Sequence, residues 1–507
     1  TRRSSDLNTL SYLTTFNNIH HLDFLAGYEI DDTYNDYLSG EAYNFTTPDK
    51  HAISNGMKTV SVGGSDSRYR LVSYLSRLNY DYKNKYYLGA SFRVDGSSRL
   101  HRDNRWGTFW SVSGAWRTIE EEFMQPVKDW LTDLRIRASY GVNGTLPSDY
   151  FGYMGLSSIS GGYLEQPGIQ MSQIANPNLK WETNYNMNIG LDFGFWDRLN
   201  FMIEYYTRTT KNLLMDCPVS MTTGFSSYLM NIGEVKNKGI ELTINSTNIK
   251  IKDFSWNTTF NLGHNSNKVV KLDGEQTQIV SGTQIHKVGS SYRTFYVQEF
   301  AGINPETGNP LFYTNELDEN GNYIKEITEN SKNAQFIPYK HAEPTVNGGI
   351  SNSLRYKWLD LNFLFSYQFG GYSYDTWAQK TEHGGYDSYA NIPTYYRDSW
   401  KKPGDQTNIE VYMLGKSSSV SMHKITSSRR IHSTDYFRLK NITFGITLPK
   451  EWTNKINIGN VRFYASASNL WTWAAYDNYD PEAVSAGSAT QTTPPLKTVT
   501  FGLNINF

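Results

Sequence analysis

The last ten residues, "TVTFGLNINF" (498–507), alternate strictly between apolar and polar side chains and end on an aromatic ring. Successive side chains of an extended strand point to opposite faces. One face therefore carries Val499, Phe501, Leu503, Ile505 and Phe507, and the other is polar. A half-buried strand in a soluble antiparallel sheet alternates in the same way. The stretch thus predicts a strand, but it does not distinguish a strand of a soluble sheet from one that faces lipid.

The same alternation recurs along most of the chain. In "YNMNIGLDFGF" (185–195), Met187, Ile189 and Leu191 share one face, and Asn188 and Asp192 share the other. Equivalent patterns predict an all-β protein with about fifteen strands. The expected strands lie near 7–17, 20–30, 68–82, 85–95, 106–117, 133–142, 182–194, 199–208, 237–248, 254–264, 346–356, 359–369, 436–448, 461–472 and 497–507.

Composition points to an interface between water and an apolar phase. Aromatic residues make up 15% of the 507 residues, whereas the mean hydropathy is only −0.56. Rings in so polar a chain are typical of membrane-interface belts. The net charge of −1 gives no field that would attract nucleic acid. A single cysteine, Cys217, excludes an internal disulfide.

The lengths of the connections distinguish a membrane barrel from a soluble sheet. No run approaches the roughly 18 apolar residues of a helical span, but a transmembrane strand needs only about 10 alternating residues. Short links such as "NNI", "KNK", "WDRL" and "KW" alternate with long ones. This asymmetry predicts a transmembrane antiparallel β-barrel with short periplasmic turns and long external loops. The long loops are expected near 31–67, 143–181, 209–236, 265–345 and 370–435.

Three further expectations follow from this arrangement. Residues 118–132 should form a small helix on the short-turn side. The "DGSSR" stretch (95–99) should form a tight hairpin that uses the positive φ available to glycine. If Phe507 ends on the periplasmic side, the strand at 7–17 runs inward, so we expect at least one more strand upstream, because bacterial single-chain barrels have an even strand number.

Several stretches, read in order, resemble the C-terminal barrel half of SusC-like (SusC/RagA-type) TonB-dependent outer-membrane transporters. They are "SYLSRLNYDYKNKYYLGASFRVDGSSRL" (73–100), "RWGTFWSVSGAWR" (105–117), "LRIRASYGVNG" (134–144), "NPNLKWETNYNMNIGLDFGF" (176–195), "NIGEVKNKGIEL" (231–242), "YFRLKNITFGITLPK" (436–450), "SASNLWTW" (466–473) and "YDPEA" (479–483).

The resemblance implies a 22-stranded barrel in the bacterial outer membrane, of which residues 1–507 would supply about fifteen C-terminal strands, without the plug domain. It implies active import of oligosaccharides, with import of peptides as the alternative within the family. The expected partners are a SusD-like surface lipoprotein that acts as a lid, TonB–ExbB–ExbD, and outer-membrane lipid including lipopolysaccharide. Two transporter–lipoprotein pairs could form a dimer. The terminal Phe507 resembles the signal read by the barrel-assembly machinery.

Loop 370–435 carries the candidate contacts for substrate or lid. Its rings could stack on sugars, anchor a protein interface, or pack the loop on itself. The candidates are Tyr372, Tyr374, Trp377, Tyr395, Tyr396 and Trp400.

No enzyme, cofactor or metal site is expected. The sequence has no GxSxG, P-loop or paired-carboxylate pattern in a suitable context, and its histidines lack ligand spacing. "NELDENGNYI" (315–324) spaces three oxygen-bearing side chains but lacks the acidic closing residue of a calcium loop, so it is interpreted as an Asn-Gly hairpin turn. Two alternatives of another class remain open: a passive porin or surface adhesion barrel, and a soluble all-β glycan-binding protein.

Overall fold

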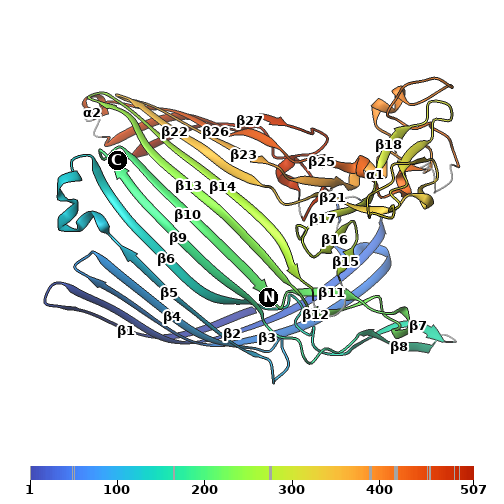
Figure 1. The fold of residues 1–507 in the computed structure, drawn as a ribbon, viewed down its shortest axis with the longest axis horizontal. Helices are drawn as coiled ribbons and strands as arrows, with labels where there is room; N and C mark the ends of the chain where they lie inside the picture. The colour runs from blue at the N-terminus through green and yellow to red at the C-terminus, as the bar shows by residue number, and fades with distance from the viewer. Residues whose placement is uncertain are drawn as a thin grey trace. The chain divides into compact units, whose positions relative to one another are not determined.

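The computed structural model describes residues 2–47, 49–50, 52–163, 166–272, 277–386, 391–415, 421–453, 455, 458–484, 486–489 and 492–506. Fifteen strands form one large sheet in which neighbours along this series are hydrogen-bonded neighbours (Figure 1). Each of the fifteen overlaps a strand expected from the sequence, although β2 and β3 are much longer than expected. They are β1 (Arg2–Phe16), β2 (His20–Phe45), β3 (Gly56–Tyr82), β4 (Tyr86–Ser97), β5 (Trp106–Trp116), β6 (Leu131–Thr145), β9 (Glu182–Phe195), β10 (Leu199–Lys211), β13 (Glu234–Ile251), β14 (Phe254–Lys271), β22 (Val346–Tyr356), β23 (Leu359–Phe369), β26 (Tyr436–Thr447), β27 (Asn460–Ala474) and β29 (Thr498–Asn506).

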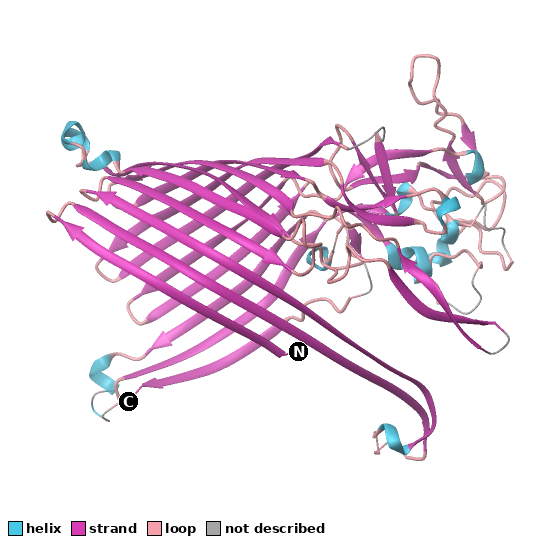
Figure 2. Ribbon diagram, turned by 90° about the horizontal axis from the view of Figure 1, so that it is seen from below, coloured by secondary structure: helices cyan, strands magenta, loops and turns pink. Residues whose placement is uncertain are grey.

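The chain divides into two compact units, which are described separately. The first consists of Thr1–Glu122, Arg135–Ile189 and Arg208–Glu234, and the second of Phe123–Leu134, Gly190–Thr207 and Val235–Phe507. Figure 2 shows that strands dominate and that the helices are short. No helix among the described residues is long and apolar enough to cross a membrane.

The short links are tight turns, as expected. Asn17 and Asn18, between β1 and β2, have φ of 52° and 58°, and Lys83 and Asn84, between β3 and β4, have 55° and 54°. Two successive residues of positive φ are typical of the type I′ turns that match the twist of a hairpin. In the second unit the 196–197 turn has the same conformation, with φ of 51° and 54°.

The prediction of a loop at 31–67 is wrong. β2 and β3 run on as one hairpin, paired from His20↔Tyr82 to Phe45↔Gly56, with one irregularity at Glu41/Ala42. Among the described residues between the strands, Ile53–Asn55 form the short 3-10 helix η1. Glycine and serine interrupt the side-chain pattern here, but backbone pairing does not require that pattern.

Two other sequence expectations need correction. The helix expected within 118–132 is two 3-10 helices, η2 (Thr118–Glu120) and η3 (Glu122–Val127), because Pro126 lies inside η3 and cannot donate a helical hydrogen bond. Gly96 of "DGSSR" lies inside β4 and is not among the residues of positive φ. Glycine is needed there because a Cβ would come within 2.7 Å of the Trp106 ring.

The sense of the alternation in β9 is that of a membrane barrel. Met187, Ile189 and Leu191 are 37%, 44% and 39% exposed, whereas Asp192 is 3% exposed and Gly190 is buried. The apolar side chains thus face outward and the polar ones inward, the reverse of a soluble sheet.

Aromatic rings mark both ends of the apolar band in the first unit. Tyr86 stacks on Trp116 at the short-turn end, with ring centroids 6.4 Å apart, and Tyr74 stacks on Trp106 at the other end, also at 6.4 Å. Both tryptophans belong to β5, which has 11 residues. At about 3.3 Å per residue and a tilt of about 40°, this strand spans roughly 25 Å along the membrane normal, the height of an outer-membrane apolar band.

The closing strand β29 explains the glycine in "TVTFGLNINF". Gly502 lies directly opposite Tyr464 of β27, and a Cβ on Gly502 would overlap the Tyr464 ring. The glycine thus provides the space into which a neighbouring tyrosine packs. Phe507, the expected assembly signal, lies outside the described residues.

Outside the large sheet, the described residues of the first unit form two hairpins, β7–β8 and β11–β12. Its apolar cluster of Leu100, Phe109, Leu179 and Trp181 lies at the loop end of the strands. The additional elements are β7 (Leu156–Tyr163), β8 (Gln166–Gln173), β11 (Leu214–Pro218), η4 (Met221–Thr223) and β12 (Ser227–Asn231).

In the second unit, loops 265–345 and 370–435 fold together with residues 475–489. One buried cluster combines Phe295 and Val297 with Tyr374 and Ile431, so the two long loops share a core. The elements of these loops are β15 (Gln278–Ser281), β16 (Gln284–Lys287), β17 (Thr294–Gln298), β18 (Phe300–Ile303), β19 (Pro310–Tyr313), β20 (Ile327–Thr328), η5 (Ser331–Asn333), β21 (Phe336–His341), β24 (Tyr372–Asp375), α1 (Thr376–Thr381), η6 (Thr394–Asp398), η7 (Met422–Lys424), η8 (Ser428–Arg430), β25 (Ile431–Ser433), η10 (Pro481–Ala483) and β28 (Ser488–Ala489). The helix α2 (Lys450–Thr453) lies apart from them, in the connection between β26 and β27.

The "NELDENGNYI" stretch is a hairpin turn, as expected. Leu317 bridges to Tyr323, and Gly321 has a φ of 80°. The Asp318 carboxylate accepts hydrogen bonds from the backbone N–H of Asn320 at 2.9 Å and of Asn322 at 2.8 Å. These bonds lower the pKa of Asp318.

The assignment of the lipid-facing side of β9 can be tested by introducing an arginine on one face of the strand or on the other. Ile189→Arg should cost about 2–4 kcal/mol, because it places a charge in the apolar band. Asn188→Arg introduces the same side chain on the polar face and should assemble normally. The measurement is the heat-modifiable gel mobility of the folded barrel; normal assembly of Ile189→Arg together with failure of Asn188→Arg would reverse the assignment.

Candidate functional site

Two of the sequence motifs meet in a charged clamp that ties residues 475–489 to β26. Arg438 and Lys440 of "YFRLK" pair with Asp480 and Glu482 of "YDPEA", and the Lys440 Nζ–Glu482 distance is 2.6 Å. Arg438 is only 2% exposed. These charged groups therefore hold a loop in place and are already satisfied by one another.

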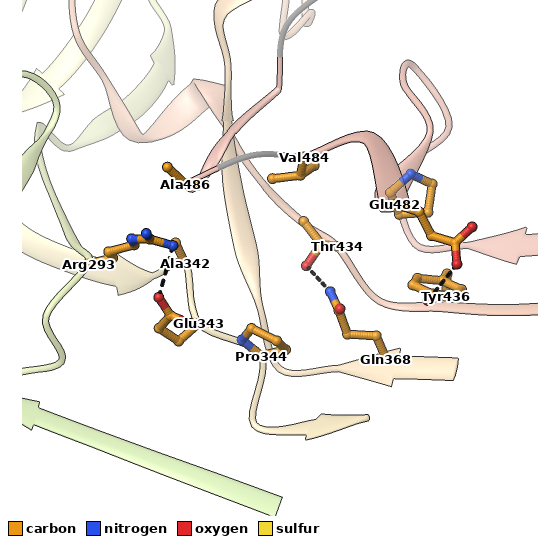
Figure 3. Close-up of a pocket in the computed structure, with 12 residues that line it drawn as sticks. Arg293, Ala342, Glu343, Pro344, Gln368, Thr434, Tyr436, Glu482, Val484 and Ala486 are labelled. Atoms are coloured by element: carbon orange, nitrogen blue, oxygen red, sulfur yellow. Dashed lines mark hydrogen bonds and ion pairs between the residues drawn. The ribbon is translucent and has the colours of Figure 1, made fainter. Parts of the chain in front are cut away.

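A polar pocket lies beside this clamp, where β23 and β26 meet the loops (Figure 3). Its volume is about 340 Å³. We call it the rim pocket. Its lining residues are Arg293, Ala342, Glu343, Pro344, Gln368, Thr434, Tyr436, Pro481, Glu482, Val484, Ala486 and Gly487.

The rim pocket offers both donors and acceptors. Arg293 and Glu343 form an ion pair at 3.2 Å, with side chains 38% and 31% exposed. The Gln368 amide donates to the Thr434 hydroxyl at 3.2 Å. A neutral ligand rich in hydroxyl groups can exchange hydrogen bonds with such a mixed surface.

A second hollow surrounds Trp377. Its volume is about 210 Å³, and we call it the Trp377 pocket. Trp377 is 37% exposed and lines the hollow, so part of its surface is accessible. Its lining residues are Asp375, Trp377, Asp477, Asn478, Tyr479, Asp480, Ala489, Thr492 and Pro494.

Asp375 fixes the floor of the Trp377 pocket. This fully buried carboxylate caps α1 by accepting the Ala378 N–H at 2.7 Å. It also accepts hydrogen bonds from the Tyr476 hydroxyl and the Asn478 amide, both at 3.0 Å. An aromatic ring beside fixed carboxylate and amide groups can contact both the apolar face and the hydroxyl groups of a sugar.

A buried polar network holds the loop that carries Trp377. Glu382, which follows α1, forms an ion pair with the 1%-exposed Arg430 and accepts a hydrogen bond from the Tyr395 hydroxyl. Burial lowers the pKa of Arg430 to about 10, so the guanidinium stays charged at neutral pH. Nearby, the His432 ring stacks on Tyr476, with centroids 3.7 Å apart and an interplanar angle of 3°.

The structure separates the six aromatic candidates into different environments. Tyr374 and Tyr396 are 1% and 5% exposed, so their rings pack inside the loop. The Trp400 indole donates to the Pro305 carbonyl at 2.7 Å, and Tyr372 packs against the shared core of the two loops. These four rings are engaged within the loop body.

Two of the six candidates, Trp377 and Tyr395, are exposed. Tyr395 is 38% exposed, although its hydroxyl is bonded to Glu382. Trp377 lines a pocket. A role for any of the six in contacting substrate or lid stays a prediction.

Sequence reasoning missed the polar groups around these pockets. Asp477 and Asn478 lie between β27 and β29, a connection that was not counted among the long loops. The adjacent "YDPEA" motif was a signal that this connection is structured. No sequence motif around Arg293 or Glu343 indicates that the two residues pair, because they are brought together only by the fold of a long loop.

Comparisons with known proteins give a consistent result. The family described as "TonB dependent receptor-like, beta-barrel" matches residues 1–316. TonB-dependent receptor P3 of Formosa agariphila is 32% identical over 531 residues, covering 99% of this chain and 52% of that protein. TonB-dependent receptor SusC of Bacteroides thetaiotaomicron is 30% identical over 496 residues, covering 93% of this chain and 47% of that protein.

Among solved structures, the RagAB peptide transporter matches with a TM-score of 0.86 and 27% identity. The match covers 100% of this chain and 55% of that chain. The chain spans about half the length of the curated relatives it matches.

The burial of His432 predicts that the loop is sensitive to acid. Burial lowers the pKa of His432 from 6.5 to about 4, against an opposing effect of Asp375, while Arg430 and Arg429 lower it further. Between these pH values the unfolded loop binds a proton that the folded loop does not, so loop stability is full above pH 6.5 and falls as the pH drops toward 4. Hydrogen exchange of residues 370–386, corrected for intrinsic rates, should therefore be faster at pH 5 than at pH 7.

The matched variant for this prediction is His432→Phe, which keeps a ring for stacking and removes the titration. It should flatten the pH dependence, whereas His101→Phe, in another loop, should leave it unchanged. Equal protection of the unsubstituted protein at both pH values would contradict the prediction.

Proposed function

The chain belongs to the TonB-dependent receptor-like β-barrel family of the bacterial outer membrane, and on this premise we propose that the protein imports oligosaccharides by TonB-dependent transport. The strands supply the wall of the barrel, with apolar side chains toward lipid and polar side chains toward the interior. The loops of the second unit supply the surface that meets the cargo.

The Trp377 pocket is the observation that carries the choice of oligosaccharide. A sugar ring presents C–H groups on its faces and hydroxyl groups around its edge. The accessible indole suits the former, and the carboxylate and amide groups of Asp477 and Asn478 suit the latter. The volume of about 210 Å³ suits one sugar unit of a longer chain.

Import against a gradient needs an energy source and a gate. In the proposed mechanism TonB–ExbB–ExbD supplies the energy through a plug domain, and a SusD-like lipoprotein closes the loop side as a lid. The long loops project apolar side chains that a lid could cover. Leu317 is 62% exposed, Tyr323 43% and Leu414 66%.

Peptide import is the second candidate. The likeness to the RagAB peptide transporter favours it. The Arg293–Glu343 pair of the rim pocket supports it as well, since a zwitterionic peptide end could exchange partners with that pair. A passive porin or adhesion barrel would require neither a plug nor a lid.

The cargo can be tested at Trp377. Trp377→Ala should weaken oligosaccharide binding to the full-length protein by about 3- to 10-fold, because an aromatic stack is worth about 0.5–1.5 kcal/mol. Calorimetry against a panel of oligosaccharides and peptides measures this. Trp358→Ala, an exposed tryptophan at the β22–β23 turn, is the control.

The binding panel and an uptake assay distinguish oligosaccharide import, peptide import and passive passage through a barrel. Binding of peptides alone would replace oligosaccharide by peptide as the cargo. Uptake that persists when TonB is deleted would favour the passive barrel.

The lid can be tested on the exposed loop residues. Leu317→Asp combined with Leu414→Asp should reduce co-purification of the partner lipoprotein severalfold, because each places a charge in an apolar contact. Phe123→Asp, at a 65%-exposed residue on the short-turn side, should leave it unchanged. Full recovery of the lipoprotein with the double variant would exclude these residues from the lid contact.

A further inference from the structure

One segment between β27 and β29 contributes to the walls of both the Trp377 pocket and the rim pocket. We call this segment, residues 475–489, the strap; the structure describes it at 475–484 and 486–489. Its residues in the Trp377 pocket are Asp477, Asn478, Tyr479, Asp480 and Ala489. Its residues in the rim pocket are Pro481, Glu482, Val484, Ala486 and Gly487 (Figure 3). A displacement of the strap therefore changes both pockets at once.

A single buried guanidinium holds the strap at the point where it passes from one pocket to the other. The short helix η10 (Pro481–Ala483) begins after Asp480, whose carboxylate accepts the Glu482 N–H at 2.9 Å. Arg438 of β26 is 2% exposed and pairs with Asp480 at 2.5 Å and with Glu482. One side chain thus fixes a wall residue of each pocket.

On the side of the Trp377 pocket, the strap is tied to loop 370–435. Asp375 accepts hydrogen bonds from the Tyr476 hydroxyl and the Asn478 amide, both at 3.0 Å. The Tyr374 N–H donates to the Gly487 carbonyl at 2.8 Å, and β24 pairs in parallel with β28. Asp375 itself is fully buried, so these bonds are shielded from water.

On the side of the rim pocket, the strap is tied to loop 265–345 and to the sheet. The Gln284 amide donates to the Ala486 carbonyl at 2.7 Å. The Tyr436 hydroxyl donates to the Glu482 carboxylate at 3.0 Å. Because one short segment makes the contacts on both sides, we expect them to form and break as one cooperative unit. Packed elements of this kind have discrete arrangements and do not deform gradually.

We propose that the strap couples the two pockets and that Arg438 is the positioning residue through which the coupling acts. A ligand in the Trp377 pocket orders the strap, so a ligand in the rim pocket then loses less conformational entropy on binding. The effect is reciprocal, because a coupling free energy belongs to both sites. The inference rests on the proposed function, which assigns cargo to the Trp377 pocket.

Hydrogen exchange of the full-length protein in detergent tests the coupling without any ligand. Asp375→Asn weakens the ties on the Trp377 side and should speed exchange in peptides covering 481–484, on the rim side, by about threefold or more. Arg438→Met should speed exchange there by about tenfold or more. In the double variant the rate should equal that of Arg438→Met alone, because the transmitting contact is already lost. Additive effects, or no effect of Asp375→Asn on 481–484, would overturn the proposal.

Two further variants control this measurement. Glu329→Gln alters another carboxylate that accepts bonds from three side chains, all within loop 265–345, and should leave exchange of the strap unchanged. Arg438→Lys keeps the charge but cannot span Asp480 and Glu482 together, so its rate should lie between those of the unsubstituted protein and Arg438→Met. It also serves if Arg438→Met does not assemble, which heat-modifiable gel mobility reveals.

The ligand arm separates the coupling from the choice of cargo. Its probe is the oligosaccharide of the calorimetric panel that binds most tightly. In the unsubstituted protein the probe should slow exchange at 476–480 and also at 481–484, and in Arg438→Met only at 476–480. Slowing confined to 476–480 in the unsubstituted protein would refute the coupling and leave the cargo intact. If no oligosaccharide binds, the proposed cargo fails, and the ligand-free rates still decide the coupling.

Discussion

Backbone hydrogen bonding in a solvent without hydrogen-bonding partners is the constraint on which this structure depends. Each unpaired N–H or C=O group in hydrocarbon costs several kcal/mol, so strands can cross a membrane only as neighbours in one sheet. The fifteen strands meet this requirement in chain order. Once the strands are paired, the lipid outside the barrel favours apolar side chains on the outer face and polar side chains on the inner face. In β9, Ile189 therefore lies on the outer face and Asp192 on the inner face.

That constraint also determines what could be predicted from the sequence. Within the apolar band the period-two pattern is enforced at each residue, and all fifteen strands are visible in it. Beyond the band nothing enforces it, so the outer part of the β2–β3 hairpin, from Asn35 to Ser67, lost the pattern while keeping its backbone pairs. The role of Gly96 was mispredicted for another reason. Gly96 and Gly502 are set by the rings of Trp106 and Tyr464, and those contacts depend on strand register.

The sequence showed which loops are rich in aromatic residues, but it did not show which of those residues are buried. Counting aromatic residues identified the loop that carries Trp377, but it could not tell an accessible ring from a core ring such as Tyr374. That difference arises because β24 joins β25 and β28, three short strands from distant parts of the chain. The same sheet brings residues 477–480 beside α1. No local pattern encodes a pocket whose walls come from two connections.

The buried ion pair of Glu382 with Arg430 fixes the end of α1, the helix that carries Trp377. Such a pair adds little net stability, because removing both charges from water costs about as much as their attraction returns. The apolar cluster around Phe295 can hold the loop body together without it. The pair instead favours one arrangement, since the Glu382 carboxylate meets Arg430, Arg429 and the Tyr395 hydroxyl together in this fold of the loop. Helix α1 is thereby fixed by Asp375 at its start and Glu382 at its end, with Trp377 between them. For the proposed contact of Trp377 with a sugar, a helix fixed at both ends lowers the conformational entropy lost on binding, so more of the contact energy would contribute to affinity.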